Sequence, residues 1–194
     1  MVPEFEKLLV RLADIPYEAP FSFRKNTTVG VGGDAPLCLY PRSSTELVLT
    51  LRETEGIPRL LLGRGSNVLP SDRGFGGVVI KTDRARSMRM EGGVLYAECG
   101  VSVSAFLRFA AERGRGGLAF LAGIPASMGG VVFMNAGAGG RYIGELVESV
   151  RVYEEGEVRL LSTEDCRFAY KETRFMHQGS IVLEVCLLYT SPSP

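Results

Sequence analysis

The chain has 194 residues, of which 45% are hydrophobic and 24 are glycine. This composition is sufficient for a folded core and excludes general disorder. Lysine and arginine number 22, as do aspartate and glutamate, so a formal net charge of +0 gives no electrostatic basis for binding nucleic acid or an anionic membrane. The apolar runs are far shorter than the roughly 20 residues that span a bilayer, and the first ten residues lack signal-peptide features. We therefore expect a cytoplasmic protein without a nucleic-acid or membrane partner; its oligomeric state stays open.

The cysteines do not form a metal or disulfide pattern. Cys38, Cys99, Cys166 and Cys186 lie far apart, no C-x-x-C occurs, and the chain has one histidine, so neither a zinc site nor a disulfide framework is expected. Each cysteine lies among apolar or strand-forming neighbours, which is typical of a small buried thiol.

The first segments predict a helix, a strand and a second helix. Residues 4–15 space apolar side chains at helical intervals, and residues 26–41 are a turn-rich stretch that leads into a strand. Ser43, followed three positions later by Glu46, is a capping-box pattern, so a helix is expected from there to about Gly56.

The next segments complete a β-α-β-loop-β unit, and antiparallel patterns follow it. Residues 59–62 and 76–81 are predicted strands separated by a GRGSN loop. Residues 87–99 alternate around a Gly-Gly pair as a hairpin does. Residues 102–113 have one apolar face and precede a glycine, which predicts a helix.

The last segments complete a second lobe. Residues 149–161 are predicted as a hairpin and residues 181–188 as a strand. The order fits two small α+β lobes, 1–83 and 84–188, better than one doubly wound sheet. Because the last strand runs directly into TSPSP, residues 189–194 are interpreted as a truncated or foreign end.

The loop after the strand at 59–62 is the first chemical candidate. Its residues are Gly63, Arg64, Gly65, Ser66, Asn67, Val68 and Leu69. Glycine permits positive φ and close backbone approach, so consecutive N–H groups can point at an anionic phosphate. The loop matches neither the G-x-G-x-x-G pattern nor the P-loop. A plain turn between strands uses the same residue types, so both interpretations stay open here.

The glycine-rich segment 116–140 is the second candidate. Its proposed binding residues are Gly123, Ile124, Pro125, Ala126, Ser127, Gly129, Gly130, Asn135, Ala136 and Gly137. Small residues leave room for a planar ligand, or for close backbone packing without one. Two such segments in one small chain favour a phosphate-bearing cofactor.

Four motifs occur in order, LGRGSNVL at 62–69, GLAFLAGIPASMGG at 117–130, MNAGAGG at 134–140 and FAYKET at 168–173. Together they resemble the UDP-N-acetylenolpyruvoylglucosamine reductase (MurB) family, from about residue 26 to about residue 187. The resemblance implies an α+β, two-lobed FAD-binding fold of the vanillyl-alcohol-oxidase and para-cresol-methylhydroxylase type, with 1–83 and 84–188 as its lobes.

The same resemblance implies the chemistry. FAD would be held by the residues of the two glycine segments, NADPH would be the reductant, and a UDP-sugar, the enolpyruvyl ether of UDP-N-acetylglucosamine, would be the substrate in peptidoglycan precursor synthesis. Lys171 would be the catalytic cation beside the substrate carboxylate, and Tyr170 would contact the substrate with it. The family's serine proton donor and glutamate lie in a C-terminal domain that has no counterpart here, so the chain alone is expected to be inactive.

Three positions depart from the family. Lys171 stands where the family typically carries arginine, so a bidentate donor becomes a point charge. Ala126 stands where glycine is common, and would tighten its loop against the flavin. Gly139 replaces a larger residue, and would loosen it.

Two other functions compete with the reductase, namely another flavin oxidase of the same fold and a non-catalytic FAD-binding fragment. Covalent flavin oxidases often attach FAD through histidine. His177, the one histidine, is predicted in a loop outside both glycine segments, and this favours the reductase.

Overall fold

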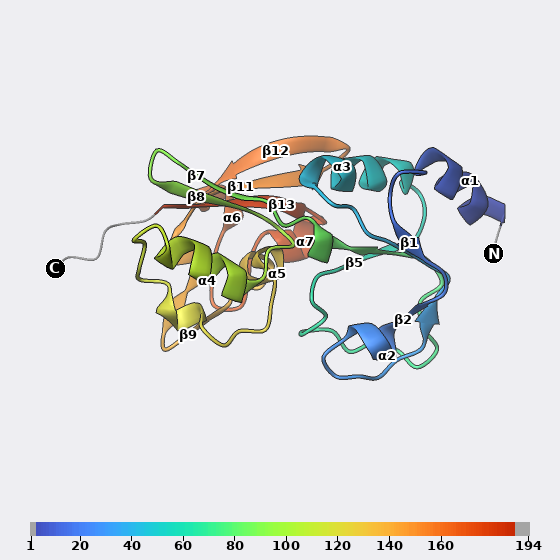
Figure 1. Cartoon of the computed structure of the whole chain (residues 1–194), viewed down its shortest axis with the longest axis horizontal. Helices are drawn as coiled ribbons and strands as arrows, with labels where there is room; N and C mark the ends of the chain where they lie inside the picture. Colours follow the sequence, from blue (N-terminus) through green and yellow to red (C-terminus); the bar gives the residue numbers. More distant parts are fainter. Residues whose placement is uncertain (1–2, 189–194) are drawn as a thin grey trace. The chain divides into compact units, whose positions relative to one another are not determined.

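The computed structural model describes residues 3–188 of the chain, so the interpretation of residues 189–194 falls outside the described residues. The chain divides into two compact units, Met1–Ala85 and Arg86–Pro194, whose described residues are coloured blue to green and green to red in Figure 1. The sequence patterns place the division near residue 83.

The first unit is built around a four-stranded sheet. Its elements are α1 (Pro3–Arg11), β1 (Tyr17–Glu18), β2 (Phe21–Ser22), α2 (Phe23–Asn26), β3 (Asp34–Ala35), β4 (Leu37–Leu39), α3 (Ser44–Glu53), β5 (Arg59–Leu62), β6 (Val78–Lys81) and the 3-10 turn η1 (Thr82–Arg84). The sheet order is β1-β4-β6-β5. Strand β6 runs parallel to β4 and β5, and β1 is antiparallel to β4. The predicted β-α-β unit is therefore confirmed, while the short pair β2-β3 was not predicted.

The cap of α3 differs in part from the predicted capping box. The Ser43 hydroxyl accepts a hydrogen bond from the Glu46 backbone N–H at 3.1 Å, as predicted. The Glu46 carboxylate, however, accepts from the backbone N–H of Arg42 at 2.7 Å, where the capping box would use the N–H of Ser43. Side-chain hydrogen bonds from the Arg42 guanidinium lower the pKa of Glu46.

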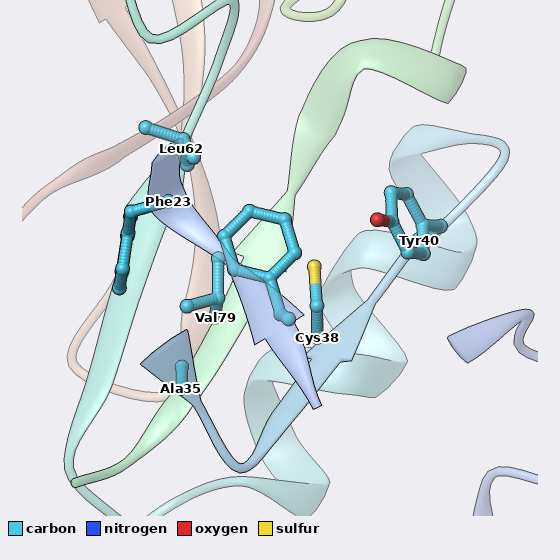
Figure 2. Close-up of a cluster of buried hydrophobic side chains, with 7 residues drawn as sticks. Phe23, Ala35, Cys38, Tyr40, Leu62 and Val79 are labelled. Atoms are coloured by element: carbon cyan, nitrogen blue, oxygen red, sulfur yellow. The ribbon is translucent and has the colours of Figure 1, made fainter. Parts of the chain in front are cut away.

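A cluster of buried side chains lies on one face of this sheet (Figure 2). It comprises Phe21, Phe23, Ala35, Cys38, Tyr40, Leu62 and Val79. Cys38 and Val79 are direct partners across the parallel pair β4-β6. Val68, from the loop that follows β5, packs against the cluster together with Leu60 and Phe75. The cluster therefore tethers the first glycine loop to the sheet by an apolar side chain.

The second unit is built around a five-stranded antiparallel sheet of order β12-β11-β13-β8-β7. Its elements are β7 (Met88–Glu91), β8 (Val94–Glu98), α4 (Val103–Ala111), η2 (Ala119–Leu121), α5 (Met128–Phe133), β9 (Gly137–Ala138), β10 (Arg141–Tyr142), η3 (Ile143–Glu145), β11 (Val147–Glu154), β12 (Glu157–Ser162), α6 (Thr163–Cys166), α7 (Phe175–Gln178) and β13 (Ile181–Leu188). Both predicted hairpins, the predicted helix and the last strand are confirmed.

The glycine-rich segment contains a helix that the sequence did not predict. Helix α5 packs against β13 and β8. A Cβ added at Gly129 would lie 2.7 Å from the Cβ of Cys99, so glycine is the residue that permits this close packing. The prediction of a loop at His177 is also wrong, because that residue lies on the four-residue helix α7.

The predicted buried thiols are confirmed, since all four cysteines are buried. Burial raises the pKa of the Cys38 and Cys166 thiols to about 12, and it raises the pKa of Cys186 as well.

Only the thiolate reacts readily with electrophiles. We therefore expect the folded protein to react with iodoacetamide at pH 8 about 100-fold more slowly, or slower still, than the guanidinium-unfolded protein. Equal rates in the two states, followed by mass spectrometry, would contradict this packing.

Candidate functional site

The loop 63–69 is held by three contacts within the first unit. The Lys81 ammonium donates to the carbonyl oxygen of Gly63 at 3.3 Å. The backbone N–H of Thr28 donates to the carbonyl oxygen of Gly65 at 3.1 Å. Val68 packs against the core cluster. The backbone between these points is thereby fixed by its own unit, which is what a preorganised ligand loop requires.

Gly65 shows why this loop needs glycine. Its φ is +69°, and an added Cβ would lie 2.7 Å from the carbonyl oxygen of Asn26 and 3.0 Å from the Cα of Thr27. The sequence pattern attributes the glycine to close approach by a ligand. The structure instead places the chain's own backbone, at the end of α2, in that space.

The side chains of Arg64, Asn67 and Leu69 are exposed, and Leu69 is 79% exposed. Gly65 is buried. Of the seven residues predicted to bind cofactor in this loop, these three exposed residues present the surface that a ligand could reach, whereas Gly65 and Val68 fix the loop.

Lys81 is a residue of this loop's surroundings that the sequence analysis missed. It is only 6% exposed, and its ammonium forms an ion pair with Asp83 at 2.7 Å in addition to its bond to Gly63. The available signal was a lysine at the end of an otherwise apolar strand, where burial of a charge demands partners.

The second glycine segment is paired with the corner between β8 and α4. The backbone N–H of Val103 donates to Ala126 O at 3.0 Å, that of Met128 to Val101 O at 2.7 Å and that of Gly129 to Cys99 O at 2.9 Å. The Ser127 hydroxyl caps α5 by accepting from the N–H of Gly130 at 3.4 Å. Residues 126–130 are therefore rigidly placed.

The same segment has an exposed part and a buried part. Gly123, Pro125 and Gly130 are exposed, and a Cβ added at Gly123 would meet nothing within 4 Å. Ser127 and Asn135 are 3% and 4% exposed. A ligand could reach the exposed members, and for the buried members the structure shows contacts with the chain itself.

Asn135 has a left-handed backbone conformation, with φ +42°, and both ends of its amide are bonded. Its Nδ2 donates to the carbonyl oxygen of Ala169 at 2.7 Å, and its Oδ1 accepts from the backbone N–H of Gly144 at 3.0 Å. The residue therefore joins the end of the glycine segment to the FAYKET segment.

Tyr170 and Lys171 occupy the tip of a tight turn. The N–H groups of Ala169 and Glu172 donate to each other's carbonyl oxygens at 3.0 and 3.2 Å, and Lys171 has φ +52°. Lys171 is exposed, with its ammonium 5.7 Å from the centre of the Tyr170 ring. The Tyr170 ring packs edge-on against Tyr142 at 5.9 Å. The turn thus presents one cation and one aromatic ring to the surface.

The presence of glycine at position 139, where the family has a larger residue, has a local explanation. Gly139 and Gly140 connect β9 to β10, and their φ values are +64° and +79°. Two consecutive residues with positive φ are what a type I′ hairpin turn requires, and glycine adopts this conformation without strain.

Each of the two segments, taken by itself, has a chemistry that suits an anionic phosphate group. Residues 63–69 and 123–137 contain no aspartate or glutamate, and Arg64 is their one charged residue. Each segment is rich in small residues, is held in place by contacts within its own unit and is exposed in part. An anionic ligand would therefore meet backbone dipoles and no opposing carboxylate within these segments.

The match to a known family decides the class of the chain, because residues 35–162 match the FAD binding domain. The chain belongs to the FAD binding domain family. Its α+β fold is that of the vanillyl-alcohol-oxidase and para-cresol-methylhydroxylase type, as the sequence analysis predicted.

The resemblance to the MurB reductases is likewise confirmed. The chain is 35% identical over 191 residues to the UDP-N-acetylenolpyruvoylglucosamine reductase of Caldicellulosiruptor bescii, which covers 96% of this chain and 60% of that protein. It is similar to the crystal structure of the reductase (MurB) from Thermus caldophilus, with a TM-score of 0.76 and 29% identity, over 91% of this chain and 63% of the other. This chain therefore spans about three fifths of the length of such relatives.

A more distant structure shares only the fold. The glucooligosaccharide oxidase of Acremonium strictum, described as carrying a 6-S-cysteinyl, 8α-N1-histidyl FAD, matches with a TM-score of 0.69 at 14% identity, over 94% of this chain and 42% of its own.

Among residues 3–188, no helix combines the length and apolar character needed to cross a membrane.

Proposed function

We propose that this chain is the flavin-binding part of an enzyme that reduces the enolpyruvyl ether of UDP-N-acetylglucosamine to UDP-N-acetylmuramate, with NADPH as the reductant. The observation that carries the proposal is the position of the Tyr170–Lys171 turn, which is hydrogen-bonded through Ala169 to Asn135 at the end of the second glycine segment. The segment that we propose to bind the cofactor and an exposed cation are thus joined within one unit of a chain that is similar to UDP-N-acetylenolpyruvoylglucosamine reductases.

FAD, when bound, supplies the hydride chemistry. In our proposal the loop 63–69 and the segment 123–137 hold its diphosphate and ribityl parts. Arg64, Asn67, Gly123, Pro125 and Gly130 are exposed and would make direct contacts. Ser66, Leu69, Ile124, Ala126, Ala136 and Gly137 would complete the two surfaces. Gly63, Gly65, Val68, Ser127, Gly129 and Asn135 would keep them in place.

Lys171 supplies the electrostatic part of the reaction. The overall change adds one hydride and one proton across the enolpyruvyl double bond, and negative charge spreads onto the substrate carboxylate on the way. An ammonium held beside that carboxylate stabilises the developing charge. Tyr170, whose ring packs on Tyr142, would contact the same substrate.

The proposed setting is the cytoplasm, with the UDP-sugar as a small-molecule partner and the product entering peptidoglycan and cell-wall synthesis. The formal net charge of +0 supports the view that nucleic acid is not a partner. The relatives extend well beyond the length that this chain matches, so we expect the 194-residue chain to bind FAD but to reduce the UDP-sugar slowly at most.

A covalent flavin oxidase is less well supported. All four thiols are buried, and the ring nitrogen Nε2 of His177 lies 3.2 Å from the Glu172 carboxylate on the exposed surface of α7. A cysteinyl linkage would require a thiol to leave the core.

The test is an assay of an active form of the protein that includes this chain. With FAD and NADPH present, the UDP-sugar enolpyruvate is expected to gain two hydrogens by mass spectrometry as NADPH absorbance falls. Oxygen-dependent oxidation of a phenol or sugar alcohol, with the enolpyruvate left unchanged, would support the oxidase instead.

A further inference from the structure

We propose that Asn135 and Thr173 are positioning residues. Their hydrogen bonds join the two stems of the Tyr170–Lys171 turn, which are the residues just before and just after it, to the C-terminal end of α5. The inference deepens the proposed function, because it assigns the residues that fix the backbone position from which the Lys171 side chain extends. Neither acts on the substrate itself.

The first fastening precedes the turn. The Asn135 Nδ2 donates to Ala169 O at 2.7 Å, and Ala169 is the residue at which the turn begins. The other end of the same amide accepts from the N–H of Gly144 at 3.0 Å. Because Asn135 is only 4% exposed, water competes poorly for either bond.

The second fastening follows the turn. The Thr173 hydroxyl donates to the carbonyl oxygen of Phe133 at 2.7 Å, and Thr173 is 1% exposed. Phe133 is the last residue of α5, so its carbonyl is one of those that a helix end leaves without a helical partner. Thr173 satisfies that carbonyl and ties the second stem to the helix.

Two stems fixed to one helix end leave the tip little freedom. The backbone of Ala169 and Glu172 is already cross-bonded, and the fastenings prevent this small hairpin from swinging as a unit. Helix α5 is itself placed by the pairing of residues 126–129 with residues 99–103. The backbone of the turn that carries Lys171 is therefore held in a fixed position relative to the segment proposed to hold the flavin. A continuous set of hydrogen bonds within one unit connects the two.

Isosteric variants separate the two bonds. Thr173→Val removes the hydroxyl and keeps the side-chain shape, whereas Thr173→Ser keeps the hydroxyl. Asn135→Asp places an acceptor against Ala169 O but retains the acceptor for the Gly144 N–H. Thr163→Val is the matched control, because the Thr163 hydroxyl also donates to backbone carbonyls of the same unit, but these belong to Val147 and Glu148 on β11 and not to α5 or the turn.

The measurement is amide hydrogen exchange of the whole 194-residue chain by NMR, read at Ala169 and Glu172 against amides of β11 and β13. We expect about five- to tenfold faster exchange at the turn in Thr173→Val and Asn135→Asp, less than twofold change in Thr163→Val, and recovery in Thr173→Ser. Unchanged turn exchange in both variants, or equal acceleration in the sheet, would overturn the proposal.

A second readout uses the flavin. On the FAD-loaded chain, Thr173→Val is expected to shift the midpoint potential in the same direction as Lys171→Gln, but less, and Thr163→Val should leave it unchanged. A shift with Lys171→Gln and none with Thr173→Val would overturn the positioning role. Failure of the chain to bind FAD would count against the proposed function alone, because the exchange experiment needs no flavin.

Discussion

Replacing Lys171 with glutamine is expected to lower the turnover of an active form of the protein by about 10² to 10³, the scale of losing one preorganised charge stabiliser. Lys171 is exposed at the tip of a fixed turn, so the substitution removes the charge without opening the core. Steady-state kinetics should show the loss in kcat, because the developing charge is greatest in the transition state. Lys171→Arg should retain activity or raise it, since a guanidinium can bind a carboxylate through two donors.

Arg167→Gln is the matched control for this variant. Arg167 is also exposed and cationic, and its φ of +49° resembles the +52° of Lys171, so both substitutions change the same charge at the same backbone conformation. Activity should persist in Arg167→Gln. Equal turnover for the wild type and Lys171→Gln would show that the lysine has no part in the chemistry.

Replacing Gly65 with valine is expected to weaken FAD binding by about 5- to 150-fold. The added side chain would meet Asn26 O at 2.7 Å, and a β-branched residue at φ +69° adds strain of order 1–3 kcal/mol. The loop must move away from the end of α2 and so lose the conformation that presents Arg64 and Asn67. Flavin absorbance after equilibrium dialysis measures the loss, and circular dichroism checks that the chain stays folded.

Gly30→Val separates crowding from backbone strain. Gly30 has the same φ of +69°, but nothing lies within 4 Å of its added Cβ. It belongs to the same unit, and it should retain FAD nearly as the wild type does. If both variants lost flavin equally while folded, backbone strain alone would explain the effect, and the packing of Gly65 on Asn26 would be irrelevant.

Local patterns predicted the regular elements well. Strand β5 is found at the predicted residues, and β13 begins and ends as predicted. In both cases an apolar run bounded by turn residues leaves little choice of where the strand begins and ends. The five-stranded order β12-β11-β13-β8-β7 could not be derived, since it brings β13 between strands from much earlier in the chain. Such pairing depends on the whole core and not on any one segment.

Helix α5 escaped prediction because glycine disfavours helices by about 1 kcal/mol per residue. Gly129 lies inside it nonetheless, since tertiary packing against Cys99 overrides that preference. The same packing shows that part of the glycine content serves close contact within the unit. The composition of the segment indicated small residues correctly but could not say which of them face a ligand.

The candidate site was predicted as a set of segments, and the structure assigns different tasks within them. Val68 and Gly65 hold the first loop, and Asn135 bonds the FAYKET segment. Lys81 and Thr173 were missed, because their roles depend on carbonyl groups 18 and 40 positions away. Side-chain contacts at such separations leave no periodic trace in a sequence.

The most direct test of the account is the flavin content of the purified 194-residue chain. After incubation with excess FAD and removal of free ligand, absorbance and chain concentration give the bound ratio. We expect a ratio close to one FAD per chain, retained in Gly30→Val and lost in Gly65→Val. A folded chain that binds no FAD at saturating concentration would contradict the assignment of the loop 63–69 and the segment 123–137 as its cofactor surfaces.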